Sequence, residues 1–134
     1  MTETVSELFA LVRGPETALA PHPDPGWVEV FPRLTEMHSL ADDWDGLGAV
    51  APPAAVVDGA LRFAGTLRSA GMPPPSVMPG ANGSVLFIWD EGPLYFDAEV
   101  TGPDRAEWMV VERGREPIHF VQEGLTTSGR VRSA

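Results

Sequence analysis

The 134-residue chain contains no cysteine and no lysine, so all nine of its basic residues are arginine. Without thiols there can be no disulfide, thiolate metal site or cysteine nucleophile. Without lysine there can be no phosphate-binding loop that ends in Gly-Lys. The nucleophile motif Gly-x-Ser-x-Gly is also missing. We therefore expect a binding protein without a cofactor, and not an enzyme.

Long apolar runs are absent as well. No stretch approaches the roughly 20 residues that span a membrane. The start of the chain, Met1-Thr2-Glu3-Thr4, lacks the basic residues and apolar run of a signal peptide. Because small secreted domains often depend on disulfides, the lack of cysteine also favours the cytoplasm. The length fits one domain, with no membrane contact expected.

Positive charge is scarce. The chain has nine arginines and 19 acidic residues, which gives a formal net charge of −10. Such a surface repels phosphate backbones, so we expect no nucleic-acid partner. It would attract a basic protein and speed the encounter. Acidity that serves only solubility explains the same composition, and the sequence leaves both interpretations open.

The first 26 residues divide into a helix and a linker. Thr4 and Glu7 form a capping-box pattern, which predicts an amphipathic helix over residues 1–13. Its apolar face carries Val5, Leu8, Phe9 and Val12. Four prolines make residues 14–26 a stiff, extended linker. The tethered helix could therefore dock on its own domain, on a second copy of the chain or on a partner protein.

Residues 27–123 are predicted to form an α+β domain. We expect a turn or short strand up to Phe31, a helix over 32–41 with Pro32 at its first position, and a longer helix over 53–70. Alternating apolar residues and turn signals then predict strands. Their expected ranges are 76–79, 84–90, 94–100, 107–113 and 117–122.

Short connections make neighbouring strands antiparallel. The prediction is two helices followed by an antiparallel meander sheet of four or five strands, plus the short tethered N-terminal helix. Pro117 suggests that the last strand lies at an edge of the sheet. Residues 124–134 are expected to be a disordered tail.

Strand alternation divides the sheet into two faces. Leu94, Phe96, Ala98 and Val100 are expected beneath the long helix, joined by Trp108, Val110, Ile118 and Phe120. The other face mixes carboxylates with apolar groups, and its expected partner-binding residues are Tyr95, Asp97, Glu99 and Met109. The strand over 84–90 is apolar on both sides, which predicts a second cover from the N-terminal helix or another protein.

Two acidic groups could serve chemistry instead. Asp42, Asp43 and Asp45 could hold Mg²⁺ or Ca²⁺. The favoured interpretation is that they shape a turn with Gly46 and Gly48, with Trp44 anchored in the core. Asp97 and Glu99, with Glu107 and His119, could form a metal site or an acid–base pair, or could simply be the wet face of a sheet. A metal-dependent hydrolytic enzyme and a structural subunit of a larger particle are therefore the rival functions.

The segment Asp43-Trp44-Asp45-Gly46-Leu47-Gly48-Ala49 is followed by Pro52, a helix, Pro73-Pro74-Pro75 and a strand through 86–89. This order resembles a loose group of small, uncharacterised bacterial proteins that share a Trp-Asp-Gly-x-Gly-Ala turn, a helix, a Pro-Pro segment and a β-meander. The resemblance covers about residues 34–112. It implies an α+β fold and carries no activity with it.

Overall fold

The chain places its helices first and its strands second. The computed structural model describes residues 25–125 and 130–133. Helix α2 (Trp27–Glu36) continues into the short 3₁₀ helix η2 (Met37–Ser39), and α3 (Ala54–Ser69) follows after a loop. The strands are β1 (Ser76–Pro79), β2 (Val85–Glu91), β3 (Leu94–Gly102), β4 (Arg105–Glu112), β5 (Ile118–Glu123) and β6 (Arg130–Ser133). The predicted α+β class with an antiparallel sheet is thus confirmed.

The sheet is a simple meander whose spatial order follows the chain from β1 to β6, with every neighbouring pair antiparallel. Tight turns set this order. Gly83, which follows Asn82, has a φ of +81° and lies between β1 and β2, and Gly92 has a φ of +72° between β2 and β3. Both need the left-handed backbone that glycine adopts without a steric penalty.

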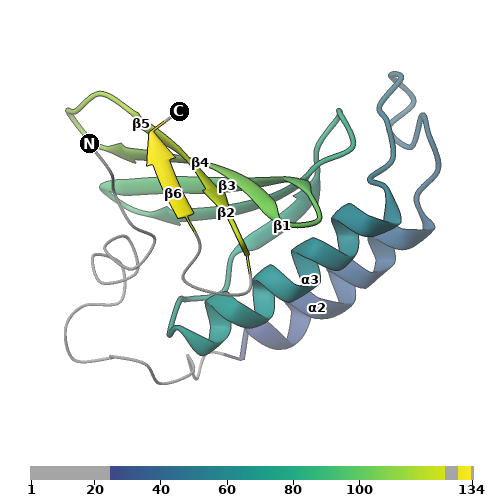
Figure 1. The fold of residues 1–134 in the computed structure, drawn as a ribbon, viewed down its shortest axis with the longest axis horizontal. Helices are drawn as coiled ribbons and strands as arrows, with labels where there is room; N and C mark the ends of the chain where they lie inside the picture. Colours follow the sequence, from purple (N-terminus) through teal and green to yellow (C-terminus); the bar gives the residue numbers. More distant parts are fainter. Residues whose placement is uncertain (1–24, 126–129, 134) are drawn as a thin grey trace.

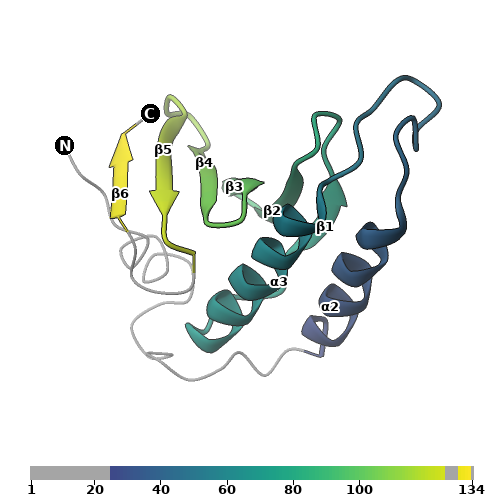
Figure 2. The same cartoon turned by 45° about the vertical axis from the view of Figure 1, so that its right-hand side comes forward.

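Both helices lie on the same face of the sheet, so the molecule has two layers (Figures 1 and 2). Helix α3 packs on β2 and β3, and α2 contacts both α3 and the edge strand β1. Phe63 of α3 meets Phe87 and Trp108 edge-on, with ring centroids 5.0 and 5.7 Å apart. Stacked rings extend this contact along the sheet through Trp89, Phe96 and Phe120. The core therefore lies between the helices and one face of the sheet.

Three tryptophans are buried in that core, and Trp44 is not among them. Trp27, Trp89 and Trp108 are at most 2 % exposed, and each indole N–H has a partner. Trp27 donates to the carbonyl of Met72, Trp89 to that of Pro73, and Trp108 to the side chain of Gln122. Trp44, expected in the core, is only partly buried, because it lies in the loop beyond the end of α2. Ile118, expected on the covered face, is 46 % exposed.

Helix α2 begins five residues earlier than the predicted start at Pro32. Its buried face carries Trp27, Val30 and Leu34. The free energy gained by burying these side chains outweighs the cost of placing Pro32 inside the helix. Pro32 lies on the exposed side of the helix. The carbonyl that loses its helical hydrogen bond belongs to Val28, which is 68 % exposed, so water can reach it.

The C-terminal region also differs from the prediction. Among the described residues the sheet has six strands, one more than the largest number expected. The additional strand, β6, lies within the stretch expected to be disordered and pairs with β5, which places β5 inside the sheet and not at its edge. Residues 124 and 125 are fixed by Asp104, which accepts hydrogen bonds from Gly124 N and Leu125 N at 2.9 and 2.8 Å.

No helix in the described ranges is long and apolar enough to cross a membrane. The predicted N-terminal helix, with Val5, Leu8, Phe9 and Val12, lies outside the described residues, as does the linker up to residue 24.

Candidate protein-binding site

The candidate site is the face of the sheet opposite the helices, which we call the outer face. Alternation along β3 places Tyr95, Asp97 and Glu99 on it, and the β3–β4 register sets Asp97 opposite Met109 and Glu99 opposite Glu107. The four sheet residues predicted from the sequence to bind a partner therefore share one face. The other four predicted residues, Val5, Leu8, Phe9 and Val12, lie outside the described residues. No helix or strand within residues 25–125 and 130–133 lies over them, since α2 and α3 occupy the other side (Figure 1).

Aliphatic side chains border these carboxylates on two sides. On β2, Ile88 is opposite Asp97 and Leu86 is opposite Glu99. On β4, Met109 and Val111 share the outer face with Glu107. All four aliphatic side chains are only partly buried. The centre of the face is therefore an acidic row on β3 between two columns that are mainly apolar.

Hydrogen bonds hold the two β3 carboxylates in place. The Tyr95 hydroxyl donates to Oδ2 of Asp97 at 3.1 Å, and the Ser84 hydroxyl donates to Oε2 of Glu99 at 2.6 Å. Ser84 is itself buried, with 3 % of its surface exposed. The sequence identifies the carboxylates by alternation but does not single out Ser84, because only the pairing of β2 with β3 brings this residue to Glu99.

Two residues of the outer face, Asp97 and Tyr95, have shifted pKa values. Partial burial raises the pKa of Asp97 and the nearby charge of Glu99 raises it further, while the hydrogen bond from Tyr95 and the attraction of His119 oppose the shift. Burial also raises the pKa of Tyr95, and its bond to Asp97 adds to that effect. Asp97 is therefore a carboxylate that has lost part of its hydration, and a cation brought by a partner would compensate that loss.

The same geometry brings the proposed catalytic groups onto one face but keeps His119 two strands away from Asp97. Asp97 lies on β3 and His119 on β5, with Met109 of β4 between them in the register. Two strand spacings separate the two backbones by roughly 10 Å. Within the described ranges, no three His, Asp or Glu side chains form a group that could hold a metal ion. The described residues therefore include no such group for the metal-dependent hydrolytic enzyme considered above.

The loop between η2 and α3 uses its aspartates to bind its own backbone. Oδ1 of Asp45 accepts the N–H groups of Leu47 and Ala49 at 2.8 and 3.1 Å. Asp43 accepts that of Gly48 at 2.7 Å, and Asp42 accepts that of Ala51 at 3.0 Å. The two hydrogen bonds to Asp45 lower the pKa of its carboxyl group. We call residues 42–51 the Asp loop.

The backbone of the Asp loop needs unusual angles. Gly46 and Gly48 have φ values of +74° and +88°, and Asp43 has a φ of +66°. A Cβ atom at either glycine would meet nothing within 4 Å, so backbone conformation alone favours glycine there. Trp44 adds one hydrogen bond, from Nε1 to the carbonyl of Val50 at 3.3 Å.

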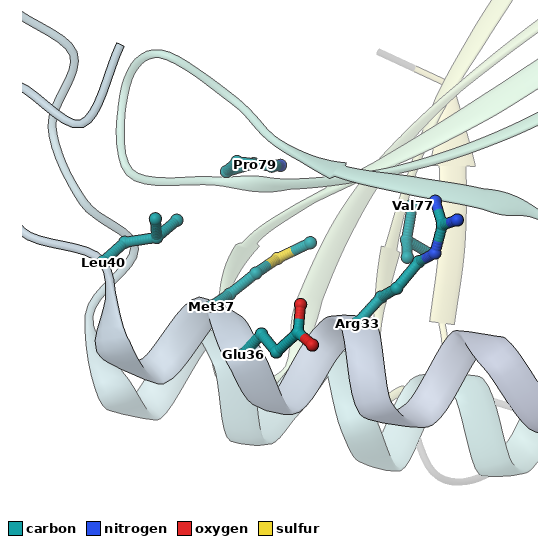
Figure 3. A pocket seen from close by; sticks show the side chains of 6 residues that line it. All are labelled: Arg33, Glu36, Met37, Leu40, Val77 and Pro79. Carbon is teal, nitrogen blue, oxygen red and sulfur yellow. The ribbon is translucent and has the colours of Figure 1, made fainter. Parts of the chain in front are cut away.

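A groove that the sequence did not indicate runs between α2 and the edge strand β1 (Figure 3). It has a volume of about 520 Å³ and is lined by Arg33, Glu36, Met37, Leu40, Val77 and Pro79. Its lining is mainly apolar, with one charge of each sign. Helical spacing places Met37 and Leu40 near one another, but nothing in the sequence shows that α2 lies beside β1.

Comparison with protein-family models, with curated proteins and with solved structures gives no match. The resemblance drawn from the Trp-Asp-Gly-x-Gly-Ala segment therefore stays a prediction, and the function has to be argued from the surface of the molecule.

Proposed function

We propose that the protein is a non-catalytic binding domain that takes a basic protein partner on the outer face of its sheet. One observation carries the proposal. Partly exposed aliphatic side chains border a row of carboxylates on a face that no described helix covers. Protein interfaces combine apolar contacts with charges that match those of the partner.

The sign of the partner's charge follows from the charges on this face. Asp97, Glu99 and Glu107 occupy its centre. The ion pairs within residues 25–125 involve none of the three. Glu99 and Glu107 lie directly opposite one another, an arrangement that costs free energy through like-charge repulsion. A lysine or arginine placed between them would relieve that repulsion.

The same charges argue against a second copy of the chain at this face. A symmetric dimer would place each surface patch against its own counterpart. The carboxylates of two molecules with a net charge of −10 each would then meet. A basic protein fits better, so we propose the role of an inhibitor or antitoxin-like neutraliser, or of a small adaptor in a bacterial assembly.

The test begins by identifying the protein that the full chain captures from its host and purifying it. Titration calorimetry then compares the wild type with Met109→Arg, which puts a bulky cation on the outer face. Val28→Arg is the matched control, since Val28 is 68 % exposed on α2. We expect Met109→Arg to weaken binding by at least about tenfold and Val28→Arg to leave it nearly unchanged. Equal effects of the two substitutions would contradict the proposal.

A further inference from the structure

The groove between α2 and β1 is lined by apolar side chains from both elements. Met37 and Val77 are 5 and 8 % exposed, whereas Leu40 and Pro79 are only partly buried. Figure 3 shows the side chains of Arg33 and Met37 extending from the helices toward the strand. The volume of about 520 Å³ lies in the range of pockets that take apolar groups of another molecule or segment.

The two charged residues of the groove have opposite signs. Arg33 and Glu36 are both exposed, and neither takes part in the ion pairs of residues 25–125. A purely basic partner gains little here, because Arg33 offsets the attraction of Glu36. The groove therefore matches an occupant that has an apolar face and carries charges of both signs.

The first 13 residues of the same chain have this composition. Their apolar residues follow the i, i+3, i+4, i+7 spacing of a helix that lays one face in a groove: Val5, Leu8, Phe9 and Val12. Arg13 comes four positions after Phe9, so it borders the apolar face of that helix. Two glutamates supply the other sign. Because a helix this short is marginal by itself, it needs a surface to pack on.

The chain outside the described residues also starts at the right place and is long enough. The described part begins at residue 25, directly before α2, and Trp27 is bonded to the carbonyl of Met72, shortly before β1. The linker therefore leaves from the Arg33 end of the groove. The helical rise from Trp27 to Leu40 is roughly 20 Å, and residues 14–24 reach roughly 34 Å when extended. The linker can thus bring residues 5–12 to any part of the groove.

We propose that residues 5–12 dock as a helix in the groove between α2 and β1 of their own chain, with Arg13 beside Glu36. Attachment through a short linker gives the segment an effective concentration in about the millimolar range, so a small contact area is sufficient. A second copy of the chain lacks this advantage and brings its own net charge of −10. The inference is independent of the outer-face function, and it makes the N-terminal helix part of the domain.

Disulfide scanning of the full chain tests this docking. Because the chain has no cysteine, Phe9→Cys can be combined in turn with Glu36→Cys, Leu40→Cys or Pro79→Cys. Ile88→Cys, on the outer face, is the control. A disulfide forms only where two Cα atoms approach to about 4–7 Å. We expect a disulfide within one molecule at one or more groove positions and little at position 88.

Three results would overturn the proposal: no disulfide at any groove position, disulfides that join two molecules, or a yield at position 88 equal to that in the groove. None of them bears on the Met109→Arg comparison, so the two proposals fail separately.

Charge reversal then tests the contact between Arg13 and Glu36. It is made in whichever of the pairs with Leu40→Cys and Pro79→Cys forms its disulfide faster. Arg13→Glu should slow disulfide formation by about two- to fivefold, as expected for an exposed ion pair, and adding Glu36→Arg should restore the rate. Glu7→Arg, on the opposite side of the predicted helix, is the control and should not slow it. An Arg13→Glu variant that Glu36→Arg does not rescue would overturn this contact.

Discussion

At the scale of single residues, two glycines of α3 give a sharp test of the packing. A Cβ atom on Gly59 would lie 2.5 Å from the carbonyl oxygen of Pro103, which belongs to the backbone of the β3–β4 turn. A Cβ atom on Gly65, six positions along the same helix, would meet nothing within 4 Å. Gly59 thus lets α3 approach the β3–β4 turn closely, whereas Gly65 lies where a larger side chain would fit.

We expect Gly59→Ala to lower the free energy of unfolding by about 1–3 kcal/mol, because the helix must move away from the turn. Gly65→Ala should raise the free energy of unfolding by about 0.5–1 kcal/mol through better helix propensity. Urea denaturation followed by circular dichroism measures both. A stabilising Gly59→Ala would show that α3 does not approach the β3–β4 turn this closely.

Asp97 is a second residue whose environment makes a measurable difference. Its pKa is raised in the folded protein, mainly by burial, so the folded state binds the proton more tightly than the unfolded chain. The favourable contribution of the protonated group is complete below the ordinary value of 3.8 and is lost as the pH rises through the folded pKa. Asn cannot ionise and still accepts the hydrogen bond from Tyr95.

Asp97→Asn should therefore raise the free energy of unfolding at pH 7, and the gain should shrink as the pH falls through the raised pKa of Asp97 and be gone below 3.8. Asp90→Asn is the control, since Asp90 is exposed on the same face. Thermal unfolding at several pH values gives the comparison. A gain from Asp97→Asn that is the same at every pH would mean that burial does not oppose its ionisation.

At the scale of helices and strands, the packed aromatic residues of the core stabilise the fold. Trp108 stacks on Trp89 and Phe120, each with ring centroids 5.8 Å away, and receives the edge of Phe63. We expect Trp108→Ala to cost about 3–5 kcal/mol of stability. Trp44→Ala should cost about 1 kcal/mol, since Trp44 is partly exposed and has one long hydrogen bond. Chemical denaturation measures both losses of stability. A larger loss for Trp44→Ala than for Trp108→Ala would contradict this description of the core.

The same scale shows what the sequence could predict. The long helix and β1 to β5 were found within a few residues, because local signals define them: the apolar stripe of α3, the alternation of each strand and turns such as Asn82-Gly83. The start of α2 was missed because burial of Trp27 and Leu34 overrides the effect of Pro32. Strand β6 was missed because its order depends on pairing with β5, a contact that its own composition does not reveal.

The candidate site was predictable to a similar extent. Alternation along β3 placed Tyr95, Asp97 and Glu99 on one face of the sheet, and the antiparallel pairing of β3 with β4 adds Met109 to it. The groove beside β1 depends on how α2 packs, which is a tertiary property.

At the scale of the whole molecule, the net charge of −10 should govern how fast a partner arrives. Opposite charges speed diffusional encounter, and salt screens them over about 10 Å at 0.1 M. We expect the association rate with the basic partner to fall by about tenfold between 0.05 and 0.5 M salt, with a smaller change in the dissociation rate. Stopped-flow fluorescence measures both rates, and an association rate that does not respond to salt would exclude electrostatic steering.

The most direct test of the outer face as a binding surface is an amide chemical-shift map. The ¹⁵N-labelled full chain is titrated with the purified partner, and the shifts are plotted on the structure. We expect the largest changes at outer-face positions of β2, β3 and β4, among them Ile88, Asp97 and Met109, with small changes along the exposed side of α2. Changes confined to α2, α3 or the groove beside β1, with β3 and β4 unaffected, would contradict the account.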